Sequence, residues 1–402
     1  MEDNLASKEG SVFSGRFFLF SLVLASFAVG ALPLLVTLLM VDIGNTFNIV
    51  VGSTSQINTT YSIIAAVFAL LIGALSVRFR HKFLLLVGLL IINVSAVGCL
   101  MAFNFSMALA FYTLSGVGFA LVSPMTLALV GEHFSLEKRA GAIGWIVAGG
   151  AMVYFIGAPL IALVANFGGW RFAVLAFVIP ISLTSLLLVW LGLRSARSGS
   201  ISRSVDWQAY FGSFGEILSN RSAFSCLIGD FFRSASFVTI LIYAASFGRQ
   251  RFFQSIETAS LIILVAAFCY TLGSLVSDRV IRKLGRKSAT VLTAFLSGTL
   301  GGAYVFMPLE IIYLPVVFAA SWFFGMVVSS ANSLSLEQIP TMRGMMMSVD
   351  SAAINLGSAF GTAIGGVVLL FFNYEGLGIV LGLMGIISAP VFLFFTKDPT
   401  RK

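Results

Sequence analysis

Charged side chains are scarce in this 402-residue chain. Asp, Glu, Lys and Arg together make up 10% of it, whereas hydrophobic residues make up 58%. Ordinary soluble domains carry about 25% charged residues, so a surface that faces water cannot be built from this composition. The shortage of charge excludes a soluble globular protein and indicates that lipid surrounds most of the chain.

Cysteine and histidine are rare as well. Cys99, Cys226 and Cys269 each lie alone inside an apolar run, where thiols usually behave as small buried hydrophobes, so we expect no disulfide. His81 and His133 fall in separate loops, too far apart to indicate a metal pair or a catalytic base. The chain also lacks a phosphate-binding Gly-Lys-Ser/Thr loop and any assembled nucleophile. We therefore expect no cofactor, no metal and no enzymatic activity, and ATP is not the direct energy source.

Long apolar runs recur along almost the whole sequence. A helix needs about 20 such residues to cross a hydrocarbon core of about 30 Å. Runs such as 186–193 and 261–267 show none of the polar and apolar alternation of a β-barrel strand. No small-residue cleavage site follows a short apolar core near the N-terminus, so we expect the first run to remain in the protein. The sequence predicts an all-α polytopic membrane protein with twelve transmembrane helices, near residues 17–40, 57–77, 83–103, 106–130, 141–165, 171–193, 222–247, 257–277, 288–307, 311–335, 345–372 and 374–396.

The basic residues are distributed unevenly between the predicted loops. Both termini and the loops around 78–82, 194–221 and 279–287 carry most of the 24 Lys and Arg. The loops of the opposite side keep only Arg171, Arg249 and Arg251. The positive-inside rule therefore places both termini and the long 194–221 loop in the cytoplasm. We expect the protein to reside in the plasma (cell inner) membrane. The net charge of +8 reflects this topology and contact with membrane lipids, and we expect no nucleic-acid partner.

A faint internal repeat divides the chain into two pseudo-symmetric halves. At an offset of about 205 residues, Gly118 matches Gly325 and Glu132 matches Glu337. Parallel repeats of this kind bind substrate between the halves and alternate access by rocking. The predicted organisation is a cytoplasmic tail (1–15), an N-terminal six-helix half (16–193), a cytoplasmic linker (194–221), a C-terminal six-helix half (222–396) and a second cytoplasmic tail (397–402).

Two loop motifs resemble those of a known family. Ser274-Leu-Val-Ser-Asp278-Arg279, followed by Leu284-Gly285-Arg286-Lys287, resembles the cytoplasmic gate motif of the major facilitator superfamily, within it the drug:proton antiporter and sugar-efflux branch. In that family the motif's Asp caps a helix of the opposite half, where a carboxylate favours the positive end of the helix dipole. The counterpart after the second span keeps Arg78 but has Val77 in place of the Asp. The resemblance implies a gate formed by Gly73, Arg78, Asp278, Arg279, Gly285 and Arg286.

Glycine and proline in two spans indicate bendable or closely packed helices. Gly157-Ala-Pro159 on the fifth span is similar to the family's antiporter motif, and proline there removes a backbone hydrogen bond. On the eleventh span Gly357, Gly361 and Gly365 recur every four residues, which leaves one smooth face that close helix packing explains without a ligand.

On the fourth span Tyr112 occupies the position that is commonly an arginine in efflux relatives.

Only three ionisable side chains fall well inside the predicted spans, namely Asp230, Arg233 and Asp350. Each costs about 2.5–3.5 kcal/mol at a helix centre, so all three should face protein or water. Asp230 and Arg233 are three residues apart and can pair on one helix face. The family resemblance implies that the seventh and eleventh spans both line the central cavity, which would let Asp350 share Arg233 with Asp230. Two acids that share one base leave an excess carboxylate, and desolvation favours its protonated form. We hypothesise that Asp350 or Asp230 couples transport to protons while Arg233 switches partners; the alternative is a static ion pair and a hydrated Asp350 close to the cytoplasmic end.

These features together predict a secondary active transporter. We expect a monomer that exports a small organic molecule, drug-like or sugar-like, by proton antiport with alternating access. A proton-coupled symporter or facilitator for uptake is the alternative of the same class, and a receptor or lipid-handling protein on a transporter scaffold is the alternative of another class. Candidate residues lining the substrate cavity are Gln56, Asn58, Tyr61, Tyr112, Trp145, Tyr154, Tyr243, Trp322, Asn332 and Asn355.

Overall fold

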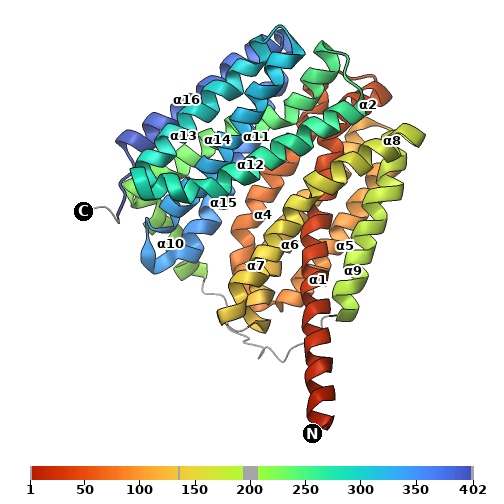
Figure 1. Ribbon diagram of the computed structural model, residues 1–402, viewed down its shortest axis with the longest axis vertical. Coiled ribbons are helices and arrows are strands. Elements are labelled where there is room, and N and C mark those ends of the chain that lie inside the picture. Colours follow the sequence, from red (N-terminus) through yellow and green to blue (C-terminus); the bar gives the residue numbers. More distant parts are fainter. Residues whose placement is uncertain (1, 135, 193–206, 400–402) are drawn as a thin grey trace. The chain divides into compact units, whose positions relative to one another are not determined.

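The computed structural model describes residues 2–134, 136–192 and 207–399, and this part of the chain is almost entirely helical (Figure 1). The helices before the linker are α1 (Glu2–Leu38), α2 (Met40–Phe47), α3 (Val51–Thr54), α4 (Gln56–Arg78), α5 (His81–Leu100), α6 (Phe105–His133), α7 (Leu136–Met152), α8 (Ala158–Ala173) and α9 (Ile179–Gly192). The later helices are α10 (Trp207–Ser219), α11 (Arg221–Arg251), α12 (Ile256–Leu284), α13 (Arg286–Ala303), α14 (Glu310–Leu336), α15 (Arg343–Phe371) and α16 (Tyr374–Phe394). Short 3-10 turns occupy Tyr304–Phe306 and Pro340–Met342.

The described helices include 11 continuous stretches that are long and apolar enough to cross a membrane. The longest, Ala142–Gly192, has 51 residues, more than twice what one crossing needs. Non-helical backbone at Gly168 and at Gly169, whose φ is +73°, divides it into two crossings. The prediction of an all-α polytopic membrane protein is therefore confirmed, and division of the longest stretch gives the twelve crossings expected from the sequence.

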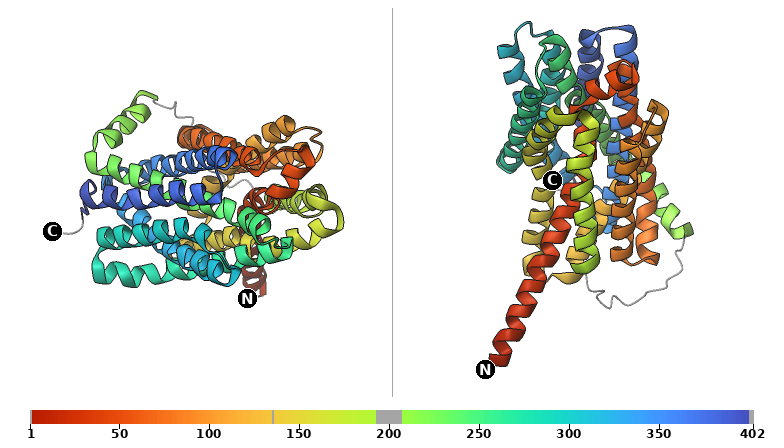
Figure 2. Two further views of the ribbon diagram at one scale, coloured as in Figure 1. Left: turned by 90° about the horizontal axis from the view of Figure 1, so that it is seen from above. Right: turned by 90° about the vertical axis from the view of Figure 1, so that its right-hand side faces the viewer.

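The chain forms two compact units. The N-terminal unit comprises Met1–Leu35 and Leu75–Ser204, and the C-terminal unit comprises Val36–Ala74 and Val205–Lys402. Helices α2 and α3 and most of α4 therefore pack with the later part of the chain. The long helices of the C-terminal unit, α11 to α16, run side by side (Figures 1 and 2). The two six-helix halves, which rest on the sequence repeat, stay a prediction.

Glycines on α15 bring its backbone against that of α11. A Cβ atom placed on Gly357 would lie 2.2 Å from the carbonyl oxygen of Phe231, and one on Gly361 would lie 2.1 Å from that of Ala235. Carbon atoms cannot approach carbonyl oxygens so closely, so only glycine permits this contact. The contact lies just beyond Asp230 and Asp350 along the two helices and fixes how these helices face each other.

The fifth predicted span departs from α-helical geometry near its proline. Val153–Gly157 forms a π-helical turn, and α8 begins directly after it with Pro159 in its first turn. Proline has no backbone N–H to donate and its ring crowds the preceding turn, so a wider turn accommodates it. Gly157 itself packs closely, since a Cβ there would lie 3.2 Å from Val153 and 3.3 Å from Leu34.

Candidate functional site

A buried ion pair lies on one face of α11. Arg233 Nε donates to Asp230 Oδ1 at 2.7 Å, and a second donation comes from Arg233 Nη2. The exposed fraction is 0% for Asp230 and 4% for Arg233. The guanidinium also lies 5.6 Å from the ring centroid of Phe324 on α14, so a cation–π contact adds to its stabilisation. The spacing of three residues predicted from the sequence produces this pairing directly.

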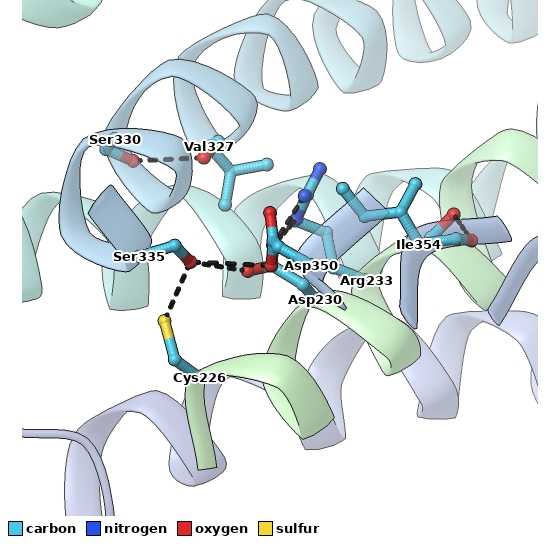
Figure 3. Close-up of polar contacts among 9 residues, drawn as sticks. Cys226, Asp230, Arg233, Val327, Ser330, Ser335, Asp350 and Ile354 are labelled. Atoms are coloured by element: carbon cyan, nitrogen blue, oxygen red, sulfur yellow. Dashed lines mark hydrogen bonds and ion pairs between the residues drawn. The ribbon is translucent and has the colours of Figure 1, made fainter. Parts of the chain in front are cut away.

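Asp350 from α15 completes the cluster. Its carboxyl group lies beside that of Asp230 (Figure 3) and is 1% exposed. Ser335, in the last turn of α14, places its hydroxyl 3.2 Å from Asp230 Oδ2 and 3.5 Å from Asp350 Oδ1. Cys226 Sγ lies 3.0 Å from the same hydroxyl oxygen. Three helices thus meet at one serine.

The cluster contains more acid than base. Ser335 has a single hydroxyl hydrogen, so it can donate to only one of the two carboxyl groups at a time. Arg233 contributes one positive charge. Its guanidinium is directed to Asp230, because it donates both of its hydrogen bonds to Asp230 Oδ1. With both acids ionised the cluster would carry one uncompensated negative charge away from water, which is costly. Uptake of one proton by the acid pair removes this cost.

The cluster lies nearer to one end of its helices than to the other. Asp230 is nine residues from the first residue of α11, about 14 Å along the axis, and Asp350 is seven residues into α15, about 10 Å. This is the end of the helices at which the linker enters. Asp350 is buried there. The proton-coupling site and the static ion pair both stay predictions.

A second group of polar side chains joins the start of α4 to α11 and α15. Tyr243 donates its hydroxyl to Ser55 Oγ at 2.6 Å. Thr59 Oγ1 lies 3.0 Å from Thr362 Oγ1, and Ser62 Oγ donates to Ser358 Oγ at 3.5 Å. Gly52 on α3 and Gly366 on α15 also touch, since a Cβ on either would lie within 2.6 Å of the other's carbonyl oxygen. We call these contacts the α4–α15 seam.

An ion pair lies beyond this seam. Arg249, near the end of α11, donates to both carboxylate oxygens of Asp42 on α2, with Nη2 3.0 Å from Oδ1. Such a two-point pairing is the strongest arrangement of these groups. The pair is partly exposed, at 13% for Arg249 and 29% for Asp42. It ties the segment after α1 to α11 at the ends of these helices opposite to the linker.

The predicted cavity-lining residues fall in different surroundings. In the C-terminal unit Tyr243 belongs to the α4–α15 seam, and Asn355 Nδ2 donates to the carbonyl of Ser351 at 2.8 Å. The buried Oδ1 of Asn332 has no hydrogen-bond partner among the described residues. Asn58 is buried, and Gln56, Tyr61 and Trp322 are half-buried. In the N-terminal unit Tyr112 is buried, whereas Trp145 and Tyr154 are exposed.

The gate-motif residues of the C-terminal unit lie around the turn between α12 and α13. Asp278 accepts a hydrogen bond from Arg282 Nη1 at 2.5 Å, and both side chains are about two-thirds exposed. Arg279 is exposed and Arg286 is half-buried. Gly285 has a φ of +83°, a left-handed conformation that favours glycine. The counterparts Gly73 and Arg78 lie outside the residues whose side chains the structure describes.

Sequence reasoning missed several members of both groups. Ser335 and Cys226 are ordinary small residues of apolar helices, and no pattern distinguishes them from others of the same type. The pairing of Asp42 with Arg249 could have been predicted from the sequence. Arg249 is one of the few basic residues on the side of the membrane opposite to the termini, and Asp42 is an acid on the same side. Opposite charges in adjacent loops could have been matched.

Comparison with known proteins places the whole chain in one family. The model of the Major Facilitator Superfamily matches residues 17–340 and again 222–402. The MFS-type transporter YceJ of Bacillus subtilis (strain 168) is 25% identical over 94% of this chain and 95% of its own length. A second protein of that organism, the MFS-type transporter YwfA, is 20% identical over 94% and 91%.

Solved transporter structures share the fold. The D-xylose-proton symporter superposes with a TM-score of 0.78 at 18% identity, covering 97% of this chain and 99% of that one. A bacterial homologue of the human lysosomal transporter Spinster, in an inward-facing and unoccupied conformation, gives 0.72 at 17% identity, covering 96% and 99%. From the family match and the shared fold, this chain is a membrane transport protein and belongs to the Major Facilitator Superfamily.

Proposed function

We propose that this transporter exports a small organic molecule, drug-like or sugar-like, in exchange for protons, and that Asp230 and Asp350 form the proton site. The observation that carries the proposal is the buried cluster of two carboxyl groups with one guanidinium. An acid pair of this charge balance has room for one proton. Protonation would change its net charge by one unit inside the protein, which is the kind of change that biases a conformational equilibrium.

The geometry supports distinct roles for the two acids. Asp230 receives both donations from Arg233, so the guanidinium is paired with this carboxyl group. Among the described residues, Asp350 receives a hydrogen bond from the hydroxyl of Ser335, at 3.5 Å. Asp350 is therefore the carboxyl group that takes up and releases the proton, and Arg233 moves toward it when it ionises. Ser335, which reaches both acids, positions the pair.

The proposed substrate route follows the polar side chains of the C-terminal unit. Gln56, Asn58, Asn332 and Asn355 offer amide groups, and the buried Oδ1 of Asn332 lacks a hydrogen-bond partner in the described part of the chain. Sites for small organic molecules combine an apolar lining with a few such polar groups. Gly157, the last residue of the π-helical turn, and Pro159 just after it support antiport because Gly157-Ala-Pro159 is similar to the helix 5 motif of exchangers.

The test measures substrate-induced proton flux in proteoliposomes with a pH-sensitive dye, against a panel of lipophilic cations and sugars. Wild-type protein should move protons opposite to the substrate, and Asp350→Asn should lose this flux. Glu257→Gln, an exposed carboxylate at the start of α12, is the matched control and should keep it. Unaltered flux in Asp350→Asn would refute the proton site, and movement of substrate and protons in the same direction would refute antiport.

We propose further that both termini and the linker lie in the cytoplasm, that the protein resides in the plasma membrane and that it works as a monomer. The positive-inside distribution of Lys and Arg supports the orientation. The test labels single cysteines from either side of right-side-out vesicles. One replaces Ser219, at the exposed end of α10, and the other replaces Phe253, which is exposed in the loop between α11 and α12. Ser219→Cys should react only from the inside, and the opposite pattern would reverse the topology.

A further inference from the structure

Helix α10 lies beside the ends of α11 and α15 that are nearest the acid cluster (Figure 1). It lies within the predicted linker (194–221) and runs from Trp207 to Ser219. A single residue, Asn220, separates it from α11 and caps that helix by accepting hydrogen bonds from the backbone N–H groups of Ser222 and Ala223. So short a connection holds α10 at a fixed corner against α11.

The side chain of Ile217 is inserted between these helices. It is fully buried, in one cluster with Ala223 and Leu227 of α11 and with Met346 and Val349 of α15. Phe214, one turn earlier on α10, packs against the same cluster. The neighbouring Leu218, by contrast, is 49% exposed. One apolar face of α10 therefore covers the gap between α11 and α15.

This apolar cluster lies directly beside the acids. Leu227 is three residues before Asp230, and Met346 is four residues before Asp350, so each apolar side chain shares a helix face with an acid one turn further on. Ile217 touches the outer side of this layer. The layer separates the two carboxyl groups from the end of the helices at which the linker enters.

We infer that α10 is a removable cap, which controls access of water and protons to Asp230 and Asp350 from the linker side of the membrane. With Ile217 seated, the described side chains of the layer, all of them apolar, cannot relay a proton. When α10 lifts, the layer opens and the acid pair meets water. The role of the cap in proton exchange rests on the proposed function, whereas its control of solvent access is independent of it.

A group of polar contacts, which we call the polar seal, lies beside the apolar layer. It marks a second route by which water could reach the acids. Ser222 Oγ donates to Gln338 Oε1 at 2.6 Å, and Gln338 Nε2 donates to the carbonyl of Lys397 at 3.0 Å. Ser225 and Thr396 are joined through their hydroxyl oxygens at 3.0 Å. Water could pass here instead if these groups separated. The two routes can be told apart by variants of Ile217 and Gln338.

The protein contains its own reporter of access. Cys226 is fully buried and its thiol contacts Ser335, which contacts both acids. A thiol reagent that reaches Cys226 has therefore reached the cluster. Cys99 is also buried but lies in the N-terminal unit, so it reports global loosening. The experiment therefore uses two single-cysteine forms of the protein. One retains only Cys226 and the other only Cys99, and the remaining cysteines are replaced by serine.

The experiment measures the rate of reaction with N-ethylmaleimide in inside-out vesicles. Ile217→Ala should accelerate labelling of Cys226 roughly tenfold, because loss of a buried aliphatic side chain favours the open state. Leu218→Ala on the exposed face and Gln338→Ala in the polar seal should change it less than about twofold. Labelling of Cys99 should not change in any of them. Ile217→Val, which removes one methylene group, should give about a twofold to threefold increase and serves if Ile217→Ala does not fold.

Two results would overturn the cap. One is an unchanged Cys226 rate in Ile217→Ala or, where that variant does not fold, in Ile217→Val. The other is acceleration by Gln338→Ala equal to or above that by Ile217→Ala, which would move the route to the polar seal. Because labelling needs neither substrate nor a pH gradient, a faster rate in Ile217→Ala supports the cap even if Asp350→Asn leaves proton flux intact and so refutes the proton site.

Discussion

Asp42 and Arg249 are 207 positions apart in the sequence, yet the guanidinium of Arg249 donates to both carboxylate oxygens of Asp42. The pair joins the segment after α1 to the far end of α11. Together with the α4–α15 seam it holds α2, α3 and the start of α4 against α11 and α15. We predict that these contacts close the protein at the end opposite to the linker and break once in each transport cycle.

Neutralising this pair should make closure at that end less stable. A partly exposed ion pair contributes about 0.5–1 kcal/mol, so Asp42→Asn should increase the open population about twofold to fivefold. The measurement is the labelling rate of a cysteine placed at Val51, which is buried in the closed state. The charge-swapped double variant, Asp42→Arg with Arg249→Asp, should restore slow labelling. If the single variants at Asp42 and Arg249 label faster and the charge-swapped variant does not return to slow labelling, the pair does not act through charge.

The two buried acids should respond differently to the same substitution. Asp230→Asn removes the direct partner of a buried guanidinium, and breaking a buried pair costs about 3–5 kcal/mol, so the variant should unfold at a clearly lower temperature. Asp350→Asn removes the surplus charge, so its stability should equal or exceed that of the wild type. Thermal unfolding in detergent measures both. Equal loss of stability in the two variants would contradict the assignment of Arg233 to Asp230.

Much of the fold follows from the sequence alone. Apolar runs of about 20 residues can satisfy their backbone in lipid only as helices, so the twelve crossings were predictable. The Gly357, Gly361 and Gly365 stripe also indicated close packing, and the structure shows its partner to be α11. The identity of that partner was not predictable, because a smooth helix face fits any other helix of complementary shape.

The candidate site was only partly predictable. Asp230, Arg233 and Asp350 stand out because charge is costly in lipid. How far these side chains lie from the helix ends and from water could not be predicted. Hydropathy shows neither where the helices end nor that α10 packs over this part of α11 and α15. Ile217 lies in a segment that the sequence marks only as a linker, and its burial depends on the gap between α11 and α15. The seam residues Ser55, Thr59 and Thr362 are common in helices and acquire a role only through their neighbours.

Close packing of α15 on α11 gives a prediction about stability. Gly361→Ala would place a methyl group 2.1 Å from the carbonyl oxygen of Ala235, so the helices must separate and the protein should lose about 2–4 kcal/mol. Gly144→Ala on α7 is the control and should be neutral or stabilising, because no atom other than those of the adjoining helix backbone lies within 4 Å of the added carbon. Unfolding temperatures compare the two, and equal temperatures would exclude a tight contact at Gly361.

The gate motif allows stability to be separated from transport. Asp278 and Arg282 form an exposed pair within α12, and such a pair contributes about 0.3–0.5 kcal/mol at most. Asp278→Ala should therefore unfold at nearly the wild-type temperature. If the motif caps a helix of the opposite half during the cycle, as its resemblance to the family motif implies, the same variant should still transport severalfold more slowly. Arg282→Ala is the control, because it breaks the pair but leaves the carboxylate, and its transport rate should stay near that of the wild type. Equal slowing in the two variants would show that the local pair matters and that Asp278 makes no contact of its own in another conformation.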